Sequence, residues 1–63
     1  MAAIALFSRV RLIHDRPETD LKAGMVGWVV EILDADHYEV EFSDDRGVTL
    51  YIGAFEAEAL EAV

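Results

Sequence analysis

The side chains best suited to chemistry in this chain are acidic residues at two short polar turns. Asp34, Asp36 and His37 stand at one turn, and Asp44 and Asp45 stand at the next. Carboxylate oxygens gathered from neighbouring loops are ligands that a hard cation prefers. Aspartate is also favoured in turns because its side chain accepts hydrogen bonds from nearby backbone N–H groups. The pattern is therefore open to a metal or small-ligand site and to ordinary turn chemistry; we favour the turn and expect no metal.

Residue types that often carry catalysis are present but poorly placed. His14 and Asp15 are sequence neighbours, and neighbouring side chains on a strand point to opposite faces, so they do not form a base and its orienting acid. Ser8 and Ser43 have no plausible base in the sequence. We therefore expect neither catalysis nor a cofactor.

A second group of acidic residues alternates with large apolar ones, as in a half-buried strand. In the segment 38–42, Glu39 and Glu41 separate Tyr38, Val40 and Phe42. Because side chains alternate between the faces of a strand, the apolar set is expected to face a core and the glutamates to face outward.

The preceding strand, from about Met25 to Leu33, is expected to pair with this segment in a hairpin. Pairing Ile32 with Val40 keeps the apolar residues of both strands on one face and leaves 35–37 as the turn. In this register Val30 lies opposite Phe42, and Glu31 lies opposite Glu41. Like charges in that position are mildly destabilising unless solvent or a cation lies between them.

A third strand is expected after a turn at 44–47, where Gly47 suits the left-handed position. Pairing Phe42 with Val48 directs Leu50 and Ile52 to the same interior. The expected core is Val10, Leu12, Trp28, Val30, Ile32, Tyr38, Val40, Phe42, Val48, Leu50 and Ile52. The opposite face would be acidic and partly apolar, which suits protein recognition. Its candidate partner-binding residues are Glu31, Leu33, Glu39, Glu41 and Tyr51.

Composition limits the size of the fold and the class of partner. The chain has 63 residues and no cysteine, so we expect one small domain over 1–63 without disulfides or thiolate metal sites. Its formal net charge is −8. Residues 1–30 hold four cations and three carboxylates, whereas 31–63 hold one cation and ten carboxylates. Such charge disfavours nucleic acid and favours a basic protein partner, although it also serves solubility alone.

The two ends of the chain complete the expected sheet. Segment 9–13 alternates as a first strand, and 14–23 is too polar for a strand. Segment 55–63 suits one short helical turn, after which the last residues would pair with the first strand and close a barrel. Segment 1–7 is apolar but too short for a signal peptide or membrane span, so we expect a cytoplasmic protein. The alternative function is a structural barrel that self-associates through this segment or an edge strand.

The order of these motifs resembles a bacterial family of short stand-alone domains of unknown function. The resemblance spans 6–63 and depends on the spacing Leu21-x-x-Gly24-x-x-Gly27, the alternating segment 38–42 and the turn ending at Gly47. It implies an all-β fold, a small five-stranded SH3-like antiparallel barrel. That barrel is similar in type to those of nitrile hydratase β subunits and photosystem I accessory subunits, which are docking subunits without chemistry of their own. Trp28 departs from the family, which usually has a small residue there.

Overall fold

The alternation of apolar and charged residues near the start of the chain forms the first strand. In β1 (Arg9–Leu12), Val10 and Leu12 are buried while Arg9 and Arg11 are exposed. The computed structural model describes residues 4–63, so the first three residues of the apolar segment 1–7 lie outside the described residues. The other elements are η1 (Pro17–Thr19), β2 (Val26–Asp34), β3 (His37–Ser43), β4 (Thr49–Glu56), η2 (Ala57–Ala59) and β5 (Leu60–Ala62).

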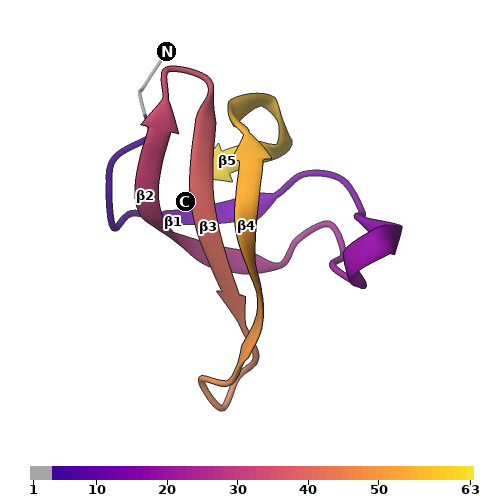
Figure 1. The fold of residues 1–63 in the computed structure, drawn as a ribbon. Helices are drawn as coiled ribbons and strands as arrows, with labels where there is room; N and C mark the ends of the chain where they lie inside the picture. The colour runs from indigo at the N-terminus through magenta and orange to yellow at the C-terminus, as the bar shows by residue number, and fades with distance from the viewer. Residues whose placement is uncertain (1–3) are drawn as a thin grey trace.

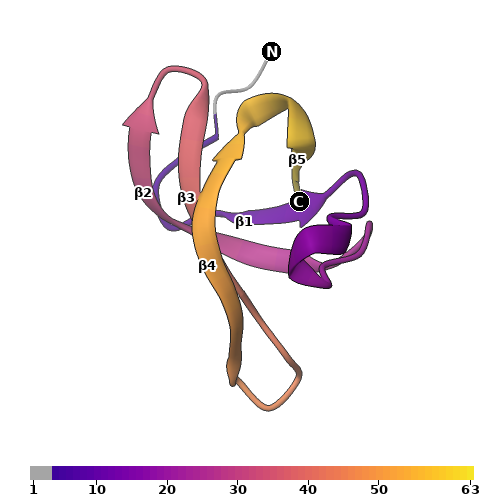
Figure 2. The same cartoon turned by 45° about the vertical axis from the view of Figure 1, so that its right-hand side comes forward.

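The described strands form one antiparallel sheet in the order β4-β3-β2-β1-β5 (Figure 1). The sheet is strongly curved, and Figure 2 shows β1 crossing behind the upright β3 and β4. The single helical turn η2 reverses the chain so that Leu60 pairs with Leu12 and Ala62 with Val10. The expected five-stranded all-β fold, the short turn near the C-terminus and the return to the first strand are all confirmed.

The core lies on the inner face of this curved sheet. Phe42 and Phe55 meet edge to face, with ring centroids 5.3 Å apart, and both are almost fully buried. Five predicted core residues are confirmed as buried, namely Val10, Leu12, Tyr38, Val40 and Phe42. Five others are wrong, because Trp28, Ile32, Val48, Leu50 and Ile52 are exposed, and Val30 is only partly buried. Val29, Leu21, Phe55, Ala59 and Leu60 fill the core instead.

The wrong core predictions in β2 result from the way this strand pairs with β3. Gly27 pairs with Phe42 and Val29 with Val40, and an extra residue at Val30 then shifts the register. A Cβ atom at position 27 would lie 2.7 Å from the Glu41 carbonyl oxygen. Only glycine permits this approach, which places Val29 inside and its neighbour Trp28 outside.

The wrong core predictions in the third expected strand result from the turn before β4. Oδ1 of Asp44 accepts hydrogen bonds from the N–H groups of Arg46 and Val48, at 2.8 and 3.0 Å. These bonds hold Val48 in the turn, so β4 begins at Thr49 with an extra residue at Leu50. Phe42 therefore pairs with Tyr51 instead of Val48. As a result, the side chains of β4 point to the face opposite to the one expected from the sequence.

Tyr51, Gly53 and Phe55 consequently occupy the inner face of β4. The Tyr51 ring packs edge to face against Phe55 at 5.9 Å. A Cβ atom at position 53 would lie 2.8 Å from the Tyr51 ring, so the missing side chain of Gly53 makes room for that ring. Leu50 and Ile52 are left exposed.

The β2–β3 turn is closed by Asp34. Its Oδ1 accepts hydrogen bonds from the Asp36 N–H at 2.8 Å and from Nδ1 of His37 at 2.9 Å. The hydrogen bond and the charge of Asp34 raise the pKa of His37 above its ordinary value. The bonds from Asp36 and His37 lower the pKa of Asp34.

We predict that Gly27→Ala destabilises the protein by about 1–3 kcal/mol, because the new methyl group meets a backbone oxygen that cannot rotate away. Gly53→Ala is the matched control, since its obstruction is a partly exposed tyrosine ring that can move. Urea unfolding of both variants measures the difference. A loss in Gly53→Ala equal to or larger than that in Gly27→Ala would contradict the proposed close approach.

We predict that Asp34→Asn lowers the pKa of His37 in the folded protein, as measured by NMR titration of its ring protons. With Asp34 present, the raised pKa of His37 stabilises the folded state fully at pH values below the unfolded pKa, about 6.5. This contribution is lost as the pH rises through the folded pKa. An unchanged titration of His37 in the variant would show that the contact is not formed in solution.

Candidate interaction surface

The outer face of the sheet, which points away from the core, carries one row of residues across four strands. Arg9 pairs with Trp28, Trp28 with Glu41, and Glu41 with Ile52. The Arg9 guanidinium lies 5.5 Å from the centre of the Trp28 ring, within the range of a cation–π contact. This row therefore presents a cation, an indole ring, a carboxylate and an aliphatic side chain side by side.

A second row runs beside the first, with Glu31 paired to Glu39 and Glu39 paired to Ala54. The sequence placed Glu31 opposite Glu41, and that pairing is wrong for two reasons. The turn is 35–36 instead of 35–37, so that Asp34 pairs with His37, and Leu33 is an extra residue in β2. All three glutamates nevertheless share the outer face, and we call Glu31, Glu39 and Glu41 the acidic ladder.

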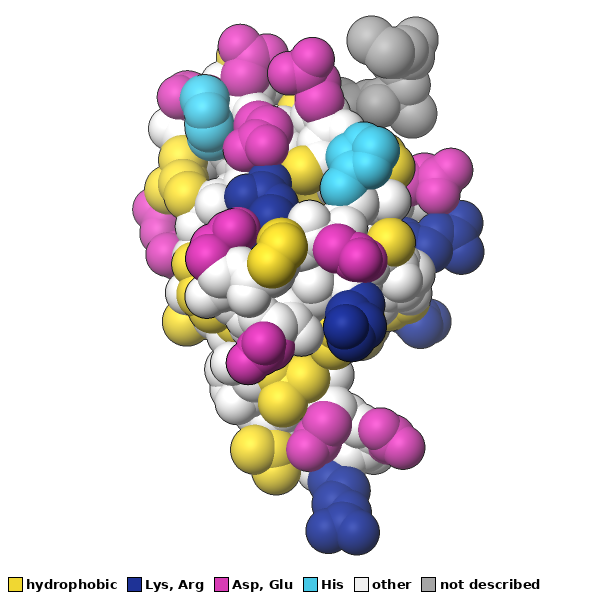
Figure 3. Space-filling model, turned by 90° about the vertical axis from the view of Figure 1, so that its right-hand side faces the viewer, with side chains coloured by type: hydrophobic (Ala, Val, Ile, Leu, Met, Phe, Trp, Pro, Cys, Tyr) yellow, Lys and Arg dark blue, Asp and Glu magenta, His cyan; other side chains and the backbone are white. Residues whose placement is uncertain are grey.

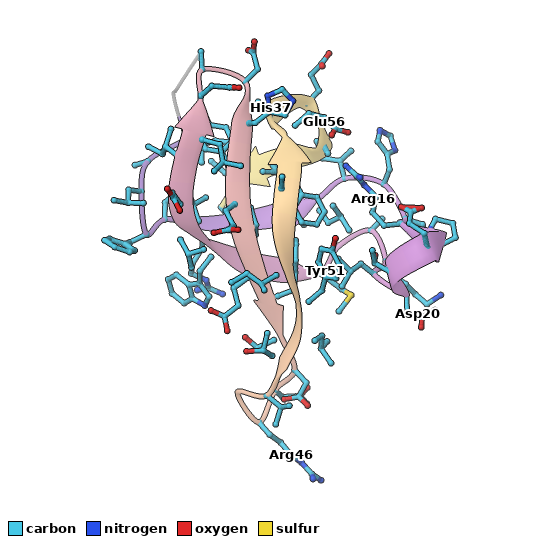
Figure 4. The ribbon with its side chains drawn as sticks, in the orientation of Figure 1. Arg16, Asp20, His37, Arg46, Tyr51 and Glu56 are labelled. Atoms are coloured by element: carbon cyan, nitrogen blue, oxygen red, sulfur yellow. The ribbon has the colours of Figure 1, made fainter. Side chains whose placement is uncertain are left out.

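The acidic ladder is not neutralised by any ion pair among residues 4–63. Two of the arginines form ion pairs elsewhere, Arg11 with Glu61 at 3.0 Å and Arg16 with Glu56 at 2.8 Å. The Arg16 guanidinium also lies 4.9 Å from the centre of the ring of Phe55, a core residue of β4. Arg16 is therefore held away from the outer face that carries the ladder. Figure 4 shows Arg16 beside Glu56 and Arg46 at the far tip of the β3–β4 hairpin. Among residues 4–63, the only side-chain hydrogen bond to the ladder is the one that the Thr49 hydroxyl donates to Glu41.

Apolar side chains lie beside the ladder with about half of their surface exposed. Trp28 is 48% exposed, Ile52 is 51% exposed, and Leu33, which forms a second bulge near the end of β2, is 46% exposed. Figure 3 views the molecule from the η1 side and shows apolar and acidic side chains interspersed along the projecting hairpin. Large exposed aromatic and aliphatic groups among charges are typical of recognition surfaces.

One of the predicted binding residues does not belong to this surface. Tyr51 pairs with Phe42 and packs on the inner face, so its outward orientation is wrong. Trp28 and Ile52, which the sequence pattern assigned to the core, take its place. Gly27 was the available signal, because placing a glycine against the large ring of Phe42 turns Trp28 outward.

Several of the other residues considered for chemistry make local hydrogen bonds. The carboxylates of Asp34 and Asp44 close hairpin turns, and Oδ1 of Asp15 accepts the Ala23 N–H at 2.8 Å. The Ser8 hydroxyl donates to the Ala5 carbonyl. Within residues 4–63 no three histidine or acidic side chains gather as a metal site. In the same range no helix is long and apolar enough to cross a membrane.

Comparison with known proteins supports the resemblance at the level of the family. No curated protein and no solved structure gives a significant match to the chain. The sequence model of one family, described as "Domain of unknown function (DUF4926)", matches residues 6–62. Because this match covers nearly the whole chain, the protein belongs to the DUF4926 family.

Proposed function

We propose that the protein is a non-catalytic interaction module that binds a basic protein through the outer face of its sheet. The observation that carries this proposal is an acidic ladder without ion-pair partners among residues 4–63, next to the exposed Trp28 and Ile52. The partner would be a neighbouring gene product that this chain neutralises or serves as an accessory subunit.

The two kinds of side chain on this face have different roles in binding. The carboxylates of the ladder attract a cationic surface over long range and so raise the association rate. Trp28 and Ile52 become buried in the complex, where tryptophan in particular contributes strongly to affinity. The net charge of −8 adds to the attraction and opposes binding to nucleic acid.

We also infer that the sheet is an SH3-like barrel. The strong curvature and the pairing of β5 with β1 after a single helical turn support this inference. The resemblance to barrels of nitrile hydratase β subunits and photosystem I accessory subunits suits a docking role, since those barrels serve their complexes without chemistry of their own.

Self-association is a second candidate, favoured by the described part of the N-terminal segment. Leu6 is 45% exposed and Phe7 is 69% exposed. Phe7 also adopts φ = 65°, a left-handed conformation that is costly for a bulky residue and is often retained for a functional contact. A mass that rises with protein concentration in light scattering, and no longer does so in Phe7→Ser, would favour this candidate.

We predict that Glu39→Lys with Glu41→Lys slows association with the native partner about tenfold or more and flattens its salt dependence. The matched control is Glu18→Lys with Glu58→Lys, which changes the net charge equally at exposed positions in η1 and η2. The partner is first isolated from the native cell with the parent protein, and its binding rates are then measured by surface plasmon resonance.

The control variant should associate with the partner nearly as fast as the parent protein. Trp28→Ala should mainly accelerate dissociation, by about fivefold or more, because it removes a buried anchor. Equal association rates for the ladder variant and the control variant would overturn the proposal and leave the ladder as solvated surface.

A further inference from the structure

The strand β4 forms one edge of the sheet. It pairs with β3 on one side, and β5 forms the opposite edge (Figures 1 and 2). Alternate N–H and C=O groups along an edge strand lack strand partners and are available to another chain.

Within the part of the chain that the structure describes, the middle of this edge has none of the usual protection. Natural edges carry charges, proline or bulges that prevent pairing with other chains. In β4 the extra residue at Leu50 interrupts one end, and the Arg16–Glu56 ion pair occupies the other. The stretch from 51 to 54 contains only Tyr, Ile, Gly and Ala, and its pairing with β3 is regular. This stretch is therefore able to accept one more strand.

The outer face of β4 leads from this edge to the acidic ladder. Ile52 lies directly beside Glu41, and Ala54 lies directly beside Glu39. A strand added to β4 would lie two strand spacings, about 10 Å, from β3. Lysine and arginine can lay their aliphatic stems over apolar neighbours and extend their charged ends beyond them. Because Glu39 and Glu41 are two residues apart, the cations that meet both must also alternate along the added strand.

We propose that β4 binds an extended basic segment by strand addition along 51–54, with alternate lysine or arginine side chains that cross Ile52 and Ala54 to reach Glu41 and Glu39. This inference rests on the proposed function, because it specifies how the basic partner engages the same face. A second copy of the chain is a poorer occupant, since its own β4 offers no cation to the ladder and each copy has a net charge of −8.

The test uses a defined probe, the peptide acetyl-Thr-Lys-Val-Lys-Val-Lys-Thr-amide, with the whole protein observed by NMR. Binding should slow amide hydrogen exchange at alternate residues within 51–54. A peptide of the same composition with its three lysines contiguous should bind about tenfold more weakly. Two further peptides are N-methylated, one at both valines and the other at the last two lysines. In an added strand, either the valine N–H groups or the lysine N–H groups face β4, but not both sets. Methylation therefore blocks the pairing in only one of the two peptides, and their affinities should differ by about tenfold or more.

Two protein variants locate the site. Ile52→Lys places a cation between the peptide and Glu41 and should weaken binding severalfold or more. Val48→Lys is the matched control, because Val48 has a similar exposure but lies in the turn outside the edge. The control should bind as the parent does.

The outcomes separate this inference from the proposed function. Equal affinities of the two methylated peptides, absence of slowed exchange in 51–54, pairing of β4 with a second copy, or no peptide binding at all would overturn strand addition. The peptide could bind without slowing exchange in 51–54 and without a difference between the two methylated forms. If its affinity nevertheless falls in Glu39→Gln with Glu41→Gln, the strand proposal fails and the acidic-face function stands. The rates of the native partner test that function independently.

Discussion

The close approach of two backbones at Gly27 determines which residues this protein buries and which it presents. The Glu41 carbonyl oxygen occupies the space that a side chain at position 27 would need. Gly27 must therefore face Phe42 on the inner side, Val29 follows it into the core, and Trp28 is turned to the outer face. The extra residue at Val30 then restores the outward direction of Glu31. One missing side chain thus places a tryptophan next to three carboxylates.

A second constraint acts on the other side of β3, where it pairs with β4, and has the same kind of effect. Asp44 holds the turn, β4 starts one residue later than simple alternation suggests, and Tyr51 and Phe55 enter the core while Ile52 leaves it. Both edges of β3 therefore place an apolar residue beside Glu41 on the outer face. The surface that we propose for partner binding results from the two registers together.

The sequence predicted the strands whose alternation is simple and failed where a strand contains an extra residue. Val10, Leu12, Val40 and Phe42 follow the period of two, and their burial is confirmed. The outward direction of Glu39 and Glu41 was predictable for the same reason. The registers of β2 and β4 were not, because bulges at Val30 and Leu50 depend on contacts with another strand or turn that periodicity does not show. As a result, Trp28 was predicted in the core and lies on the outer face, whereas Tyr51 was predicted on the outer face and packs against the core.

The fluorescence of Trp28, the only tryptophan of the chain, tests the register most directly. In the folded protein at low concentration, we expect emission close to that of the urea-unfolded chain and ready quenching by acrylamide, since about half of the side chain is exposed. Blue-shifted emission protected from acrylamide would place the indole ring in the core. That result would contradict the close approach at Gly27 and the interaction surface that depends on it.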